Sequence, residues 1–177
     1  MTDPFLIYIH VKPYVRKYLT THFPTSRHNS VTVVDLRADK QLHKLFIEGL
    51  DKSPASRITL QHSTYRTCRI AVSVSFDTFQ RHGTHLTPQA ESKINVTLEN
   101  RCKNQMLACL SVINMLTGNL ARSIQVFYER SGYNEDTWPS DSIRKIWQRE
   151  TTIPKNSFFN EIIDKFSTFI MEKLSHD

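Results

Sequence analysis

The stretch from Gly118 to Glu150 reads GNLARSIQVFYERSGYNEDTWPSDSIRKIWQRE, and it decides the fold predicted for the second half of the chain. Its first part carries apolar residues at helical spacing and ends at Gly132. A second helix begins near Trp138-Pro139-Ser140, because proline suits a first helical turn. Two helices joined by a glycine-containing turn are typical of a helix-turn-helix, so we predict a divergent one over residues 118–150.

The second of these helices is expected to have one buried and one polar face. Ile143, Ile146 and Trp147 would pack inward, and we expect both Trp138 and Trp147 to be substantially buried, so that Trp147→Ala costs roughly 3 to 5 kcal/mol. The opposite face would present basic, amide and hydroxyl groups to a groove of double-stranded DNA. The candidate DNA-binding residues are Ser140, Ser142, Arg144, Lys145, Gln148, Arg149 and Lys155.

Other features of the same stretch favour a different interpretation. The turn from Gly132 to Pro139 is longer than the few residues that a helix-turn-helix usually needs. Glu135, Asp136 and Asp141 would repel nearby phosphate groups. The alternative is therefore a protein-interaction or virion-associated structural module, whose helices bind a protein partner and whose positive charge is incidental.

The same segment also resembles a known group of proteins. The helix that contains Phe127, followed by YNEDTWPSDSIRKIWQRE, is similar to the C-terminal segment of small helix-turn-helix proteins encoded by bacteriophages and conjugative elements. Their pattern is roughly F-x-x-x-x-G-x-x-E-D-x-W-x-x-D-S-x-[KR]-K-x-x-x-R, and the resemblance covers about an eighth of the chain. It implies a DNA-binding or regulatory protein of a phage or mobile element. The matching residues are Phe127, Gly132, Glu135, Asp136, Trp138, Asp141, Ser142, Arg144, Lys145 and Arg149.

The first half of the chain is predicted to be a β-α-β-α-β-β subdomain over residues 1–82. Its helices follow Pro13 and Asp39, the latter a plausible N-cap. The last two strands alternate between apolar and polar residues and would form an antiparallel pair. The predicted strands are Phe5 to Val11, Val31 to Leu36, Arg57 to Gln61 and Cys68 to Phe76.

Residues 83–177 are predicted to form a C-terminal bundle of about four helices, which makes the fold class α+β. A long helix would begin at Thr87-Pro88 and run to about Thr117 along a single apolar stripe. The segment from Asp77 to Pro88 would be the hinge between the subdomains. A last helix, with Phe158, Phe159, Phe166 and Phe169, would seal the core or form a homodimer interface. The predicted stripe comprises Ile94, Leu98, Cys102, Met106, Cys109, Ile113 and Leu116.

Charge, cysteine count and hydropathy limit the kinds of partner and the cellular compartment that we expect. The 177 residues carry a net charge of +6, which favours polyanionic partners. Residues 1–103 hold fifteen Lys or Arg against eight Asp or Glu, whereas residues 104–177 hold eight against nine, so a basic surface must draw mainly on the first half. Three cysteines, an odd number, and the absence of a signal-like or membrane-spanning stretch predict a protein of the reducing cytoplasm with no membrane partner.

Catalytic, metal and cofactor sites are not expected. His82, His85 and Cys68 lack the spacing of a zinc site, and Cys102 and Cys109 lie about two turns apart on one predicted helix, too far for a disulfide. Four scattered glycines cannot build a phosphate-binding loop. No short nucleophile motif occurs, so we predict a protein that is not an enzyme and needs no cofactor.

Overall fold

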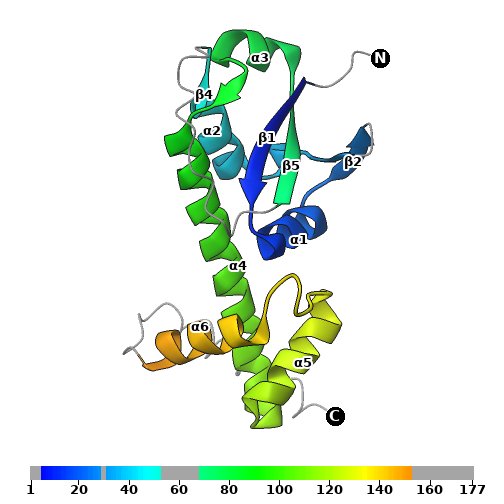
Figure 1. Ribbon diagram of the computed structural model, residues 1–177, viewed down its shortest axis with the longest axis vertical. Helices are drawn as coiled ribbons and strands as arrows, with labels where there is room; N and C mark the ends of the chain where they lie inside the picture. The colour runs from blue at the N-terminus through cyan, green and yellow to red at the C-terminus, as the bar shows by residue number, and fades with distance from the viewer. Residues whose placement is uncertain (1–4, 29–30, 53–67, 153–177) are drawn as a thin grey trace, which may run out of the picture. The chain divides into compact units, whose positions relative to one another are not determined.

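A four-stranded sheet organises the first half of the chain in the computed structural model, which describes residues 5–28, 31–52 and 68–152 (Figure 1). The strand order is β1-β5-β3-β2, with β5 antiparallel to β1 and parallel to β3. The strand of this sheet that comes last along the chain, β5, therefore lies between β1 and β3. The strands are β1 (Phe5–Val11), β2 (Thr25–His28), β3 (Val31–Val34) and β5 (Cys68–Val74).

Short helices and a second, two-stranded sheet complete this part of the fold. The sequence signals explain their starts: Pro13 opens α1, and the Asp39 carboxylate accepts the Leu42 N–H at 2.9 Å at the start of α2, as predicted. Thr87 precedes the long helix α4 and accepts the Ala90 N–H at 3.3 Å. The elements are α1 (Pro13–His22), η1 (Leu36–Ala38), α2 (Lys40–Glu48), β4 (Leu50–Asp51), α3 (Phe76–His82), β6 (His85–Leu86) and α4 (Pro88–Thr117).

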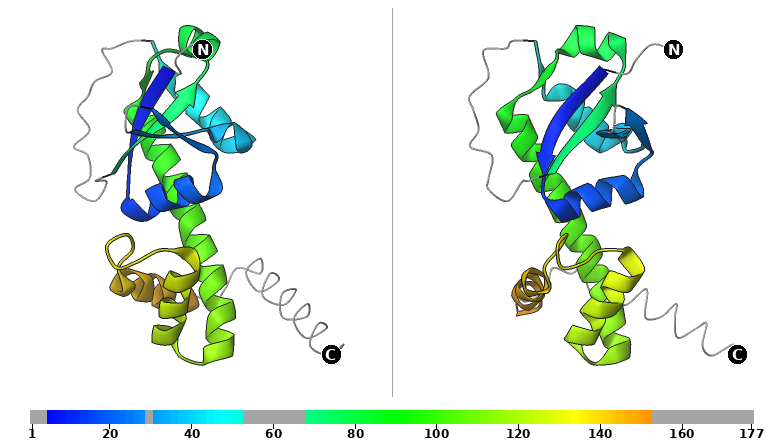
Figure 2. Two further views of the ribbon diagram at one scale, coloured as in Figure 1. Left: turned by 90° about the vertical axis from the view of Figure 1, so that its right-hand side faces the viewer. Right: turned by 45° about the vertical axis from the view of Figure 1, so that its right-hand side comes forward.

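The chain divides into two compact units, Met1–Cys102 and Lys103–Asp177, here called the N-terminal unit and the helical unit. The division falls within α4, because the first part of this helix belongs to the core of the sheet. Helices lie on one side of the sheet (Figure 2), which hence has an inner face and an opposite, outer face. Residues buried to 3% exposure or less in this core include Ile7, Ile9, Ile70, Val72, Leu19, Leu42, Phe46, Ile94 and Leu98.

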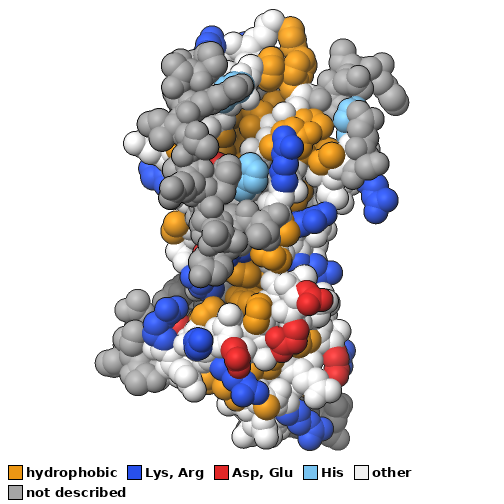
Figure 3. Space-filling view, viewed as in Figure 1, with side chains coloured by type: hydrophobic (Ala, Val, Ile, Leu, Met, Phe, Trp, Pro, Cys, Tyr) orange, Lys and Arg blue, Asp and Glu red, His pale blue; other side chains and the backbone are white. Residues whose placement is uncertain are grey.

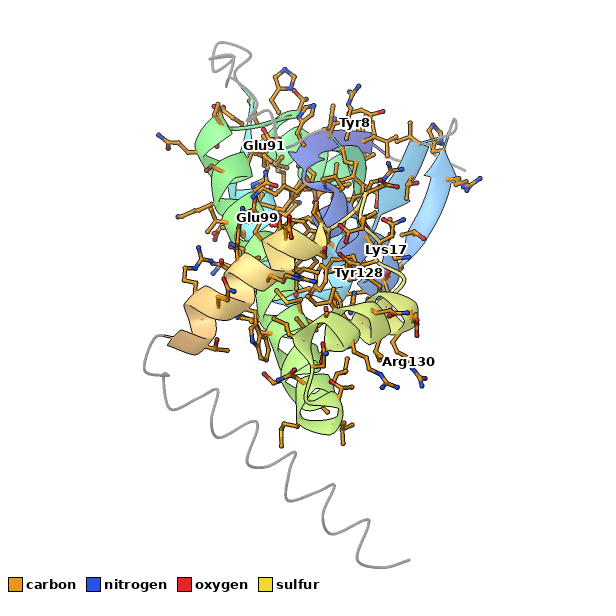
Figure 4. All side chains as sticks on the ribbon, turned by 60° about the horizontal axis from the view of Figure 1, so that its bottom comes forward. Tyr8, Lys17, Glu91, Glu99, Tyr128 and Arg130 are labelled. Atoms are coloured by element: carbon orange, nitrogen blue, oxygen red, sulfur yellow. The ribbon has the colours of Figure 1, made fainter. Side chains whose placement is uncertain are left out.

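Polar side chains attach α4 to β1, an edge strand whose outward backbone groups would otherwise lack partners. The Glu91 carboxylate accepts the His10 N–H at 2.8 Å, and the Asn95 amide donates to the His10 carbonyl at 3.0 Å. One turn further along, Lys12 donates to Glu99 at 2.7 Å. Figure 4 shows Glu91 and Glu99 along the same side of α4. This row shields the edge of the sheet with side chains in place of another strand.

The helical unit contains residues 103–117 of α4, α5 (Leu120–Ser131) and α6 (Ser140–Thr152). Within it, α5 turns back from the end of α4 (Figure 1), and Asn119 caps its start by accepting the Arg122 N–H at 3.2 Å. The buried side chains of α4 in this unit are Met106, Leu107 and Leu110. The predicted stripe is therefore wrong beyond Met106: Cys109 is exposed and Leu116 is 76% exposed, because the buried face of a long helix drifts around its axis.

The α+β class and the order of a mixed first half followed by helices are confirmed, whereas several details differ. The segment from Asp77 to Pro88 is not a simple hinge, since it contains most of α3 and all of β6. Strand β5 ends at Val74 and pairs with β1 and β3. The predicted boundary at residues 82–83 precedes the division at Cys102. The predicted strand over 57–61 and the predicted last helix lie outside the described residues.

Candidate nucleic-acid interface

Three aromatic rings fix α5 against the segment that leads into α6. Phe127 stacks on Tyr133 with ring centroids 5.4 Å apart, and Trp138 meets these two rings edge-on at 6.4 and 5.5 Å. The Tyr128 hydroxyl donates to the Trp138 carbonyl, and burial, followed by the nearby Glu135 charge, raises the pKa of Tyr128 to about 12. Trp138 is 1% exposed, which confirms its predicted burial.

The turn of residues 132–139 is ordered by its own hydrogen bonds, despite its length. Gly132 adopts the left-handed conformation (φ 68°) that ends α5, and its N–H donates to the Tyr128 carbonyl at 2.9 Å. Asn134 and Thr137 exchange two bonds, each side chain accepting the other residue's N–H at 2.9 Å. The Trp138 N–H donates to the Asn134 carbonyl at 2.8 Å. The two helices are thus joined by a defined connection.

Helix α6 presents most of the predicted site residues on its outward side. Ile143 is completely buried, whereas the residues at positions 144, 145, 148 and 149 are exposed. Positions 144 and 148 are one helical turn apart, as are 145 and 149, so the four side chains lie on a common surface. Ser142 is also exposed, and Ser140 is half-buried. The residues of this surface, here called the α6 surface, are Arg144, Lys145, Gln148 and Arg149.

The inward face predicted for this helix is present: Ile143 is completely buried, and Ile146 and Trp147, three and four residues later, are partly buried. Trp138, two residues before the start of α6, is 1% exposed. Lys155, the remaining predicted site residue, lies outside the described residues.

A carboxylate already occupies the N-terminus of α6, where backbone N–H groups could otherwise bind a phosphate. The Ser140 N–H donates to Glu135 Oε2 at 2.9 Å. Hydrogen bonds from the Ser140 side chain and backbone lower the pKa of Glu135 below its ordinary value, with a smaller contribution from Arg144. The positive end of the helix dipole favours an anion at this position, and here Glu135 supplies it. Phosphate contact through the Ser140 backbone would require Glu135 to move.

This capping contact predicts a pH dependence. Because its pKa is lowered by folding, Glu135 stabilises the folded state above its ordinary pKa of 4.5, and this contribution is lost as the pH falls through the lowered value. Glu135→Gln should therefore be less stable than wild type at pH 7, and the difference should shrink in acid. Urea titrations at several pH values measure it. Asp136→Asn, which leaves the bond to Ser140 intact, is the control and should show no such convergence.

The charge around the α6 surface is mixed. Asp141 lies in the first turn of α6, and Arg149 Nε lies 3.4 Å from Glu150 Oε1 in the last. Figure 3 shows blue and red side chains interspersed over the helical unit. By sequence, residues 103–177 carry nine Lys or Arg and nine Asp or Glu, whereas residues 1–102 carry fourteen and eight. The whole net charge of +6 therefore belongs to the N-terminal unit.

The described residues reveal neither a metal-binding cluster nor a membrane-spanning helix. Over residues 5–28, 31–52 and 68–152, no group of three His, Cys, Asp or Glu side chains could hold a metal ion. Within the same ranges, no helix has both the length and the hydropathy to cross a bilayer. Cys68, Cys102 and Cys109 form no disulfide with one another, and partial desolvation by neighbouring protein atoms raises the pKa of the Cys109 thiol, although its side chain is exposed.

The row formed by Glu91, Asn95 and Glu99 was not predicted from the sequence. The three polar residues are spaced four apart, and Asn95 and Glu99 each directly follow an apolar residue, Ile94 and Leu98. A polar repeat at helical spacing beside an apolar stripe was the signal that could have revealed the row. Asn95 is fully buried, and its Oδ1 has no hydrogen-bond partner in the described part of the chain.

Comparisons with protein-family models, with curated proteins and with solved structures find no match for this chain. The resemblance to phage and conjugative-element proteins therefore stays a prediction from the residues of Gly118 to Glu150.

Proposed function

We propose that the chain is a non-catalytic DNA-binding or regulatory protein of a phage or mobile element, which acts in the cytoplasm and binds double-stranded DNA through α6. The observation that carries the proposal is the α6 surface: four basic or amide side chains point outward from a helix that an aromatic cluster fixes to α5. A recognition helix that lies in a major groove needs polar side chains on its outward face and a second helix that holds it in place. No cofactor is needed for this function.

The contacts would divide into two kinds. Arg144, Gln148 and Arg149 are long enough, and suitably exposed, to reach base edges, whereas Lys145 and Lys155 would meet phosphates. The balanced charge of the helical unit means that it attracts DNA weakly at long range. Specific binding would thus rely on base contacts more than on general attraction.

Arg149→Ala is expected to cost about 1 to 3 kcal/mol of binding free energy on a preferred duplex and to relax discrimination at that position. Lys155→Ala should weaken binding to all sequences about equally and lower the slope of log affinity against log salt by about one unit. Duplexes selected from a random pool and titrated at several salt concentrations separate the two effects. If the wild-type chain bound no duplex in that pool at micromolar concentration and low salt, the proposal would be abandoned.

A second candidate function, binding of a protein partner by the helices, is favoured by one observation. Met115 and Leu116, at the end of α4, are 62% and 76% exposed, which is unusual for large apolar side chains that lie next to each other. Under this alternative, Met115→Glu with Leu116→Glu should abolish association while leaving the thermal melt unchanged. Sedimentation of the wild-type chain, alone and at rising concentration, tests the simplest form, a homodimer; a monomer at all concentrations counts against that form.

A further inference from the structure

The outer face of the sheet in the N-terminal unit carries a stacked aromatic and basic pair. Side chains alternate between faces along a strand, so Leu6, Tyr8 and His10 of β1 share the outer face with Arg69, Ala71 and Ser73 of β5. The Arg69 guanidinium carbon lies 3.6 Å from the centroid of the Tyr8 ring. Arg69 is exposed and Tyr8 is half-buried. The pair is thus fixed by the register of two strands and remains open to solvent.

We propose that this outer face binds single-stranded nucleic acid, with a base stacked on the Tyr8–Arg69 pair. A guanidinium whose central carbon lies 3.6 Å from a ring centroid covers one face of the ring, and its own opposite face can receive a base, since bases stack on guanidinium planes as well as on aromatic rings. The N–H groups at the edge of the same guanidinium can donate to the adjoining phosphate. The pair therefore offers one contact for a base and one for the backbone that follows it.

The electrostatics of the N-terminal unit match this ligand. The four strands of the sheet contain no Asp or Glu, and residues 1–102 carry the entire net charge of +6. The carboxylate of Glu91, on α4 beside β1, accepts the His10 N–H at 2.8 Å and lies 3.3 Å from the His10 ring nitrogen. In Figure 3, basic and hydrophobic side chains appear together over β1 and β5. A strand of phosphates would meet attraction on this face.

The open region of this face lies around Tyr8, His10 and Arg69. Ala71 and Val33 are buried, whereas Tyr8, His10 and Arg69 retain exposure. Figure 4 shows Tyr8 on β1, the edge strand. The site is therefore a short platform for one or two bases, and affinity for longer strands would come from the basic surroundings. This site is independent of the α6 surface, which belongs to the helical unit.

The test uses the full chain and two fluorescein-labelled twelve-nucleotide probes, oligo-dT and oligo-U, in anisotropy titrations at low salt. Tyr8→Leu should weaken binding about tenfold, and Tyr8→Phe should retain it, because stacking needs the ring and not the hydroxyl. Arg69→Gln should weaken binding at least about fivefold and lower the salt slope by about 0.7. The probe that binds more tightly identifies DNA or RNA as the preferred strand.

Three controls make the outcome decisive. Arg81→Gln removes an equal charge from an exposed side chain of α3 and should change affinity less than twofold; an effect as large as that of Arg69→Gln would overturn the proposal. Arg130→Gln removes a charge from an exposed side chain of α5 and should also change oligonucleotide affinity less than twofold, because Arg130 belongs to the helical unit. Absence of oligonucleotide binding by the wild-type chain at micromolar concentration overturns the proposal. Poly-glutamate, a polyanion without bases, is the last control: the proposal is also overturned if poly-glutamate competes with oligo-dT and its own binding is insensitive to Tyr8→Leu.

Discussion

Replacing Trp138 by alanine is expected to lower the free energy of unfolding by about 3 to 5 kcal/mol, the loss typical of a large aromatic side chain in a core. The indole is 1% exposed and contacts both Phe127 and Tyr133. Its removal would leave a cavity at the point where the turn enters α6, and the remaining rings cannot fill it without breaking the hydrogen bonds of Asn134 and Thr137.

Chemical denaturation followed by far-UV circular dichroism measures this loss, and Trp147→Ala is the matched control. Trp147 is less buried than Trp138, so its truncation should cost less than that of Trp138. Each variant keeps one tryptophan, whose fluorescence reports on the helical unit. Equal destabilisation by the two substitutions, or a melt of Trp138→Ala that matches wild type, would contradict the packing described for α5 and α6.

The second large effect is expected at Gly83, where alanine should destabilise the fold by at least about 3 kcal/mol. Its φ of +116° and ψ of −175° lie in a region that only glycine adopts readily. A Cβ atom there would also lie 2.1 Å from the carbonyl carbon and oxygen of Asp51, far inside van der Waals contact. The backbone of Asp51 cannot withdraw easily, because its carbonyl accepts the Thr84 N–H at 3.1 Å and Asp51 pairs with His85 in the small sheet.

Gly118→Ala provides the comparison. Gly118 also has a positive φ, +64°, but none of the described atoms beyond its neighbours lies within 4 Å of a Cβ at that position. Only the backbone preference opposes the substitution, at a cost of about 1 to 2 kcal/mol. Thermal melts of the two variants should therefore differ clearly. A Gly83→Ala variant as stable as Gly118→Ala would show that α3 and β4 do not approach as closely as described.

Local sequence signals determined much of the secondary structure. Proline and N-cap residues predicted the starts of α1, α2 and α4, and Gly132 predicted the end of α5. Helical periodicity also predicted the outward orientation of Arg144 and Arg149 on α6. These signals act within one or two helical turns, and so they are readable from the sequence alone.

Contacts between distant residues were decided only by the tertiary structure. Strand β5 lies between β1 and β3, although a long stretch of chain separates it from each, and no local pattern encodes a choice between partners so far apart. The pairing of Arg69 with Tyr8 follows from that register, and so was not visible in the sequence. For the same reason, the sequence did not reveal that Glu135 accepts the Ser140 N–H or how deeply Trp147 is buried. Periodicity predicts the face of the helix on which a side chain lies, but only the packed neighbours decide what that face meets.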